Sequence, residues 1–138
     1  MTNTQPGTPA MLTTAYSCLL VAGLLPLVCT GIAKAGFRQY DNSQPRQWLS
    51  RQTGFRARAS AAEANSLEAF ALFAAALLAA IQTGVDAELV NRLAVTFVIA
   101  RLLYIGCYVA DKATLRSAIW AVGYGASIAL AVFAIRAA

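Results

Sequence analysis

The sequence predicts an all-α integral membrane protein built as a bundle of four transmembrane helices. Of its 138 residues, 59% are hydrophobic and only 12% are charged, whereas an ordinary soluble domain has about 25% charged residues. The apolar residues also gather in four stretches, each close to the roughly 20 residues that a helix needs to cross a bilayer. At this length the whole chain, residues 1–138, is expected to form a single domain.

The four expected spans follow one another with short polar connections, except after the first. They cover residues 12–35, 58–82, 90–110 and 115–135. The ten residues before the first span lack the basic segment that opens a signal peptide, so this span is expected to be retained. The second span has the apolar centre AFALFAAALLAAI, and its first turns are more polar.

The connection between the first two spans is strongly basic and predicts the orientation of the chain. Against Asp41 alone it carries Lys34, Arg38, Arg46, Arg51, Arg56 and Arg58. Basic loops stay in the cytoplasm, so the first and third loops are expected there and both termini on the periplasmic side of a bacterial inner membrane. The net charge of +5 therefore indicates contact with membrane lipid and not with nucleic acid.

A metal centre is not expected. The chain has no histidine. Its cysteines, Cys18, Cys29 and Cys107, all fall in expected spans without a CxxC spacing, which favours small apolar thiols.

Two rows of polar residues interrupt the expected spans. They comprise Glu63, Asn65 and Glu68 in the second span, and Arg101, Tyr104 and Tyr108 in the third. The second row has the spacing i, i+3, i+7, which is one face of a helix. Charged residues at membrane depth usually face a protein interior or a wet cavity. With Arg116 at the start of the fourth span, the rows predict a polar pocket on the cytoplasmic side, within a chain or between chains.

A purely structural interpretation stays open at this point. Glu68 and Arg101 are expected, on that interpretation, to pair with each other and hold two helices together, which contributes about 0.6 to 2 kcal/mol. Arg58 and Arg116 would then be interfacial side chains that reach the headgroups.

Two segments resemble the membrane-associated proteins in eicosanoid and glutathione metabolism, the MAPEG family, and in particular its bacterial members. They are RASAAEANSLEAFALFAAALLAA at 58–80 and RLLYIGCYVADKATLRSAIWAVG at 101–123. The specific elements are Asn65-Ser-Leu-Glu68, and the Arg101, Tyr104, Tyr108 row followed by Leu115-Arg116-Ser117.

The resemblance implies a homotrimer that binds glutathione as co-substrate between neighbouring subunits at the cytoplasmic side. It implies that Arg116 is the catalytic residue, which stabilises the glutathione thiolate. The residues expected to contribute to glutathione binding are Asn65, Glu68, Arg101, Tyr104, Tyr108, Arg58 and Ser117. A guanidinium beside the sulfur lowers the thiol pKa from about 8.5, and the thiolate is the nucleophile.

The implied activity is that of a glutathione-dependent transferase or peroxidase, whose lipophilic small-molecule substrate arrives from the bilayer. Two positions depart from the eicosanoid enzymes of the family. Ala61 stands where those enzymes carry an arginine, and Trp120 stands where they carry a tyrosine. A leukotriene or prostaglandin synthase is therefore not expected, and Arg58, one turn before Ala61, is expected to replace the missing carboxylate contact.

Two other functions are compatible with four short spans. One is a non-catalytic trimeric membrane protein whose polar rows serve assembly. The other is a small multidrug exporter, which is disfavoured because Leu12 to Ala33 contains no acidic residue.

Overall fold

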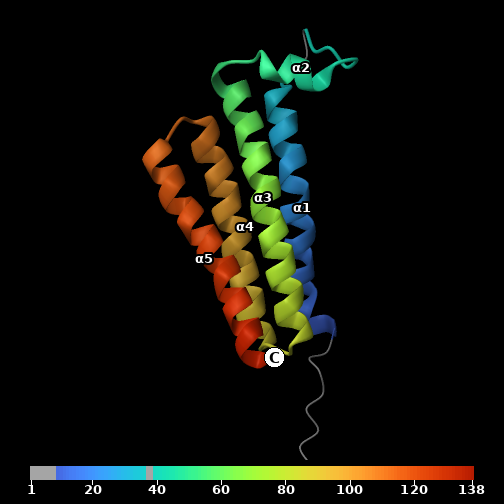
Figure 1. The fold of residues 1–138 in the computed structure, drawn as a ribbon, viewed down its shortest axis with the longest axis vertical. Helices are drawn as coiled ribbons and strands as arrows, with labels where there is room; N and C mark the ends of the chain where they lie inside the picture. The colour runs from blue at the N-terminus through green and yellow to red at the C-terminus, as the bar shows by residue number, and fades with distance from the viewer. Residues whose placement is uncertain (1–8, 37–38) are drawn as a thin grey trace, which may run out of the picture.

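The computed structural model describes residues 9–36 and 39–138, which form a bundle of long helices with one short helix across its end (Figure 1). The elements are the 3-10 turn η1 (Pro9–Leu12), α1 (Thr13–Ala33), α2 (Pro45–Ser50), α3 (Gly54–Gln82), α4 (Ala87–Val109) and α5 (Ala113–Ala137). No strand occurs in these two ranges. The polar lead of residues 1–8 and Arg38 lie outside the described residues.

The predicted all-α bundle is confirmed, and its helices differ from the expected spans mainly at their beginnings. α3 begins at Gly54 and not at residue 58, because the polar turn before the apolar centre continues the same helix. α4 begins at Ala87 and not at residue 90, and the side chain of Asp86 caps it by accepting from Leu89 N at 3.0 Å. The six-residue α2, with Pro45 in its first turn, was not expected.

Small side chains hold the bundle together. The buried core contains Ala15, Ala22, Ala69, Ala76, Ala80, Ala94 and Ala126, and alanine lets helix backbones approach closely inside a membrane. The rings of Phe73 and Phe97 stack between α3 and α4 with their centroids 3.9 Å apart. At Gly123 an added Cβ would lie 3.5 Å from Ala100 Cβ, so α4 and α5 are in close contact there.

Much of the outer surface of the bundle is apolar. α1, α3, α4 and α5 are each long and apolar enough to cross a membrane. Only about a third or less of the residues in their most apolar windows are buried inside the chain. Large side chains such as Leu27 and Ile135 are 66% and 76% exposed. This surface needs lipid or another subunit to cover it.

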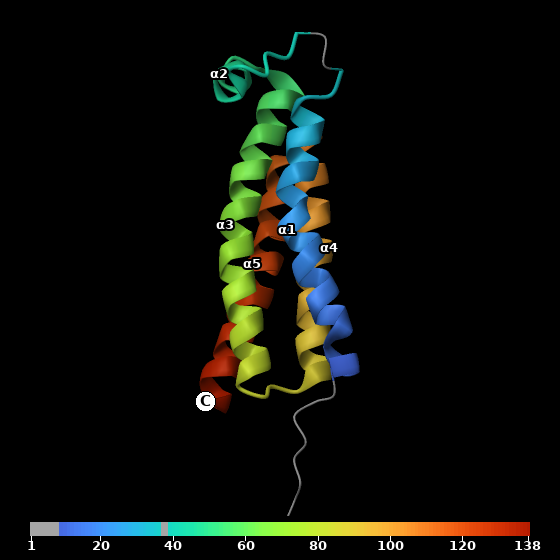
Figure 2. The same cartoon turned by 90° about the vertical axis from the view of Figure 1, so that its right-hand side faces the viewer.

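At the α2 end of the molecule, the turn between α4 and α5 lies apart from α3, as Figure 1 shows, and Figure 2 gives the same bundle from the side. Residues 113–122 of α5 include no buried residue, whereas burial begins at Gly123. The first turns of α5 therefore stand apart from the core and leave room beside α3.

Candidate functional site

A polar cavity of about 390 Å³ lies where α5 diverges from α3. It is lined by Asn65 of α3, Tyr104 of α4, and Arg116, Ser117, Trp120 and Ala121 of α5. Three helices thus contribute an amide, a phenol, a guanidinium and a hydroxyl to one space.

Aromatic rings position the arginine of this cavity. Tyr104 is 4% exposed, and its ring packs edge-on against Tyr108 with the centroids 5.6 Å apart. The guanidinium carbon of Arg116 lies 4.2 Å from the centroid of the Tyr108 ring, which is within the range of a cation–π contact. Tyr108 therefore supports Arg116 from one side, and the guanidinium keeps its hydrogen-bond donors available.

Asn65 contributes an acceptor without a partner. Its Oδ1 is buried and accepts no hydrogen bond within the described part of the chain. Buried polar atoms are nearly always hydrogen-bonded, so this oxygen is suited to a water molecule or a ligand in the cavity.

Arg101 lies behind the cavity, in the middle of the bundle. It is only 2% exposed, and its guanidinium carbon is 4.0 Å from the centroid of the Tyr104 ring. Nη2 donates to Ser66 Oγ at 3.0 Å, while Nε and Nη1 have no partner among the described residues. The side chain crosses from α4 to α3 and carries a charge that is only partly compensated.

The expected pairing of Glu68 with Arg101 within a chain is wrong. The buried side of α3 carries Ala62, Ser66, Ala69 and Phe73. Glu68 is exposed. It comes two residues after Ser66, which places the two side chains on nearly opposite sides of the helix. Ser66, not Glu68, faces Arg101.

Arg58 also lies outside the cavity. Its Nε and Nη2 donate to the carbonyl oxygen of Val109 at 3.2 and 3.0 Å, so it caps the C-terminal end of α4. The neighbouring Arg56 does the same for α1, since its Nη1 donates to Ala33 O at 3.0 Å. That Arg58 contacts a ligand carboxylate stays a prediction.

We expect Arg58→Ala to lower the free energy of unfolding by about 2 kcal/mol, because hydrogen bonds from a charged group to a helix end are among the stronger ones. Thermal unfolding in detergent measures the change. The control is Arg51→Ala, an exposed arginine of the same loop, which is expected to change stability by less than about 0.5 kcal/mol. Equal effects of the two substitutions would contradict the capping role.

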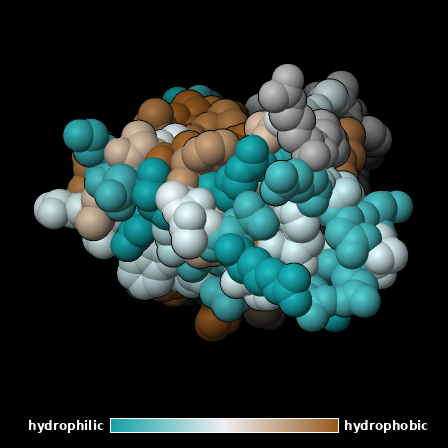
Figure 3. All heavy atoms as spheres, turned by 90° about the horizontal axis from the view of Figure 1, so that it is seen from above, coloured by the Kyte–Doolittle hydropathy of each residue, from teal (hydrophilic) through white to brown (hydrophobic). Residues whose placement is uncertain are grey.

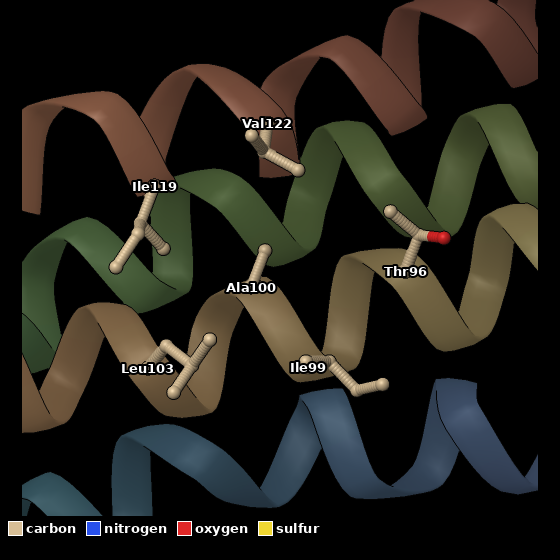
Figure 4. Close-up of a pocket in the computed structure, with 6 residues that line it drawn as sticks. All are labelled: Thr96, Ile99, Ala100, Leu103, Ile119 and Val122. Carbon is tan, nitrogen blue, oxygen red and sulfur yellow. The ribbon is translucent and has the colours of Figure 1, made fainter.

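A second, apolar cavity of about 290 Å³ lies between α4 and α5. In Figure 4, Thr96, Ile99, Ala100 and Leu103 of α4 line it together with Ile119 and Val122 of α5. Ile119 directly precedes Trp120 of the polar cavity, so neighbouring residues of α5 line the two cavities. Its lining suits a hydrocarbon group.

The structure thus divides the eight site residues expected from the sequence into three groups. Those that line the polar cavity are Asn65, Tyr104, Arg116 and Ser117. Arg101 and Tyr108 adjoin it through Tyr104 and Arg116, and Arg58 and Glu68 lie elsewhere. Sequence reasoning missed Ser66 and Ala121. Ser66 precedes Arg101 by 35 residues, and no spacing rule connects them.

The arrangement defines an integral membrane helical bundle with a small polar cavity, lined by arginine and aromatic residues, at one end. A family model for the MAPEG family matches residues 14–136, so the chain belongs to the MAPEG family. The predicted membership and the membrane-bundle fold are thereby confirmed. No curated protein matches the chain, and no solved structure matches it.

Proposed function

We propose that the protein is a glutathione-dependent transferase or peroxidase that acts on lipophilic electrophiles. MAPEG proteins are in general associated with glutathione, and the chain belongs to that family. The observation that carries the proposal is the polar cavity, which combines Asn65, Tyr104 and Arg116 from three different helices.

In this proposal Arg116 stabilises the glutathione thiolate. A guanidinium near the sulfur favours the charged form of the thiol, and arginine itself stays protonated, so its role is electrostatic and not that of a base. In the transferase reaction the thiolate forms a C–S bond with the electrophilic carbon, and the leaving group departs with its electron pair. In the peroxidase reaction two glutathione molecules become a disulfide while the peroxide is reduced to alcohol and water.

Asn65 is proposed to orient the bound thiol peptide. Its unpartnered Oδ1 is an acceptor for an N–H group of glutathione. A carboxylate of glutathione would bind at Ser117, since a hydroxyl is a suitable donor for it. Ala61 supplies no such donor, which predicts weaker binding than a second arginine at that position would give.

The second substrate is proposed to come from the bilayer. The apolar cavity between α4 and α5 (Figure 4) fits a hydrocarbon portion of such a molecule. We further propose that three copies assemble, with both termini periplasmic and the α1–α3 and α4–α5 loops cytoplasmic. In a trimer the exposed start of α5 would gain a neighbour, and the exposed Glu68 could face the glutathione amine of an adjacent subunit.

Calorimetric titration of detergent-purified protein with glutathione tests the proposal. We expect saturable binding that Asn65→Ala weakens about tenfold, which corresponds to about 1.4 kcal/mol. Glu68→Gln is expected to weaken binding as well if the neighbouring subunit contributes. Glu88→Gln is the control, because Glu88 pairs with Arg92 outside both cavities. No binding by a folded trimeric preparation would leave the polar rows as assembly contacts.

A further inference from the structure

A third cavity, of about 330 Å³, lies between α2 and the first half of α3. Its lining includes Arg46, Leu49 and Ser50 of α2 and Ser60, Glu63 and Leu67 of α3. It shares no lining residue with the polar cavity around Asn65. The function proposed above does not use it.

The cavity presents one charge of each sign. Arg46 is exposed and Glu63 is partly buried. Within the described ranges 9–36 and 39–138, neither side chain makes a hydrogen bond or an ion pair. Ser50 donates its hydroxyl proton to Gln47 O at 2.8 Å, so its oxygen still has acceptor capacity. Two opposite charges that do not neutralise each other suit a ligand that itself carries both.

The short helix α2 is held over α3 by aromatic contacts. The ring of Trp48 packs edge-on against Tyr40 with the centroids 5.2 Å apart. The guanidinium carbon of Arg56 lies 5.8 Å from the Trp48 centroid while Arg56 caps α1. The contact between Trp48 and Arg56 thus holds α2, which supplies Arg46, Leu49 and Ser50 of the lining, beside α3.

The depth of the cavity matches the boundary between headgroups and hydrocarbon. With 29 residues, α3 is about 44 Å long, roughly 14 Å more than the hydrocarbon core of a bilayer. The polar beginning of α3 accounts for this excess, and seen from the α2 end the surface is largely hydrophilic (Figure 3). Ser60 and Glu63 then lie at headgroup level, and Leu67, which is 52% exposed, lies one turn further into the membrane.

We propose that this cavity binds a zwitterionic aminophospholipid of the phosphatidylethanolamine type. Arg46 holds the phosphate by charge-assisted hydrogen bonds, and Glu63 accepts from the primary ammonium group. One acyl chain lies along Leu49 and Leu67. A choline headgroup has no N–H to donate to Glu63, and a glycerol headgroup leaves the Glu63 carboxylate without a cation.

Native mass spectrometry of the purified full-length protein tests this assignment. The probe is an equimolar mixture of phosphatidylethanolamine, phosphatidylglycerol and phosphatidylcholine with identical acyl chains. We expect about fivefold more bound phosphatidylethanolamine than either other lipid, equivalent to about 1 kcal/mol. Glu63→Gln is expected to remove this preference, and Arg46→Gln to reduce the binding of all three lipids.

Two further variants complete the experiment, one as a charge control and one that fills the cavity. Arg51→Gln removes the same charge from an exposed arginine that does not line the cavity, and it is expected to leave the preference unchanged. Ser60→Leu fills the headgroup end without altering any charge and is expected to displace the lipid even if Glu63→Gln does not fold. A wild-type preference for phosphatidylglycerol, equal binding of the three lipids, or an unchanged preference in Glu63→Gln would overturn the proposal. The measurement contains no thiol, so its result is independent of the glutathione proposal.

Discussion

Arg116→Ala is expected to lower kcat/KM for conjugation of glutathione to a lipophilic electrophile by about two orders of magnitude. In other enzymes, removing one preorganised group that stabilises a negative charge at the reacting atom lowers the rate about a hundredfold or more. Arg116 supplies the guanidinium that lines the polar cavity, and the Tyr108 ring 4.2 Å away keeps it in place. No other basic side chain lines that cavity in the part of the chain that the structure describes.

The pH dependence of kcat/KM separates this role from simple binding. If Arg116 lowers the pKa of the bound thiol, the activity of the wild type is fully developed below the ordinary thiol pKa of about 8.5. The alanine variant then regains activity as the pH rises toward that value, and Arg116→Lys keeps an intermediate profile. Arg136→Ala, at the opposite end of the same helix, is the control. An unshifted profile in Arg116→Ala would show that another group stabilises the thiolate.

Arg101→Ala is expected to lower the free energy of unfolding by about 3 kcal/mol. Arg101 is the largest of the fully buried side chains among the described residues, and truncating a large buried side chain leaves a cavity that the bundle cannot close. Arg101→Met is expected to change stability by less than about 1.5 kcal/mol, because it keeps the volume. It also removes a guanidinium of which two nitrogens have no partner.

Denaturant titration of the protein in detergent, followed by circular dichroism, compares the two variants. Ser66→Ala is a useful companion, since it removes the hydrogen bond to Nη2 and leaves the packing of Arg101 nearly intact. If Arg101→Met were as unstable as Arg101→Ala, the charge itself would stabilise the bundle. In that case the Arg101 guanidinium would have a partner at Nε and Nη1, such as bound water or a ligand.

The long helices could be predicted because a membrane requires one simple pattern, an apolar run of about 20 residues. α2 could not, since its six residues are too few to show a helical period and are held in place by tertiary contacts of Trp48. The start of α3 was placed too late for a related reason. Its first turns are polar because they extend beyond the hydrocarbon, so hydropathy does not mark them as helix.

The candidate site could be predicted from the sequence only in part, because its geometry depends on contacts between helices. Spacing along one helix predicts which residues share a face, and it correctly placed Tyr104 and Tyr108 beside each other. Spacing does not say which neighbouring helix that face contacts. For this reason Glu68 was paired with Arg101, although the rotation of α3 presents Ser66 instead. The position of Arg58 on Val109 depends on how two helix ends meet, which no local pattern encodes.

The two arginines at the start of α3 also impose an order on biosynthesis. Arg56 binds the end of α1, which leaves the ribosome before it. Arg58 binds the end of α4, which is made 51 residues later. The hydrogen bond from Arg56 to α1 can form while the chain is still a two-helix hairpin. The hydrogen bonds from Arg58 to Val109 can form only after α4 has been inserted. A nascent chain that stops before Val109 therefore lacks the carbonyl oxygen that Arg58 binds.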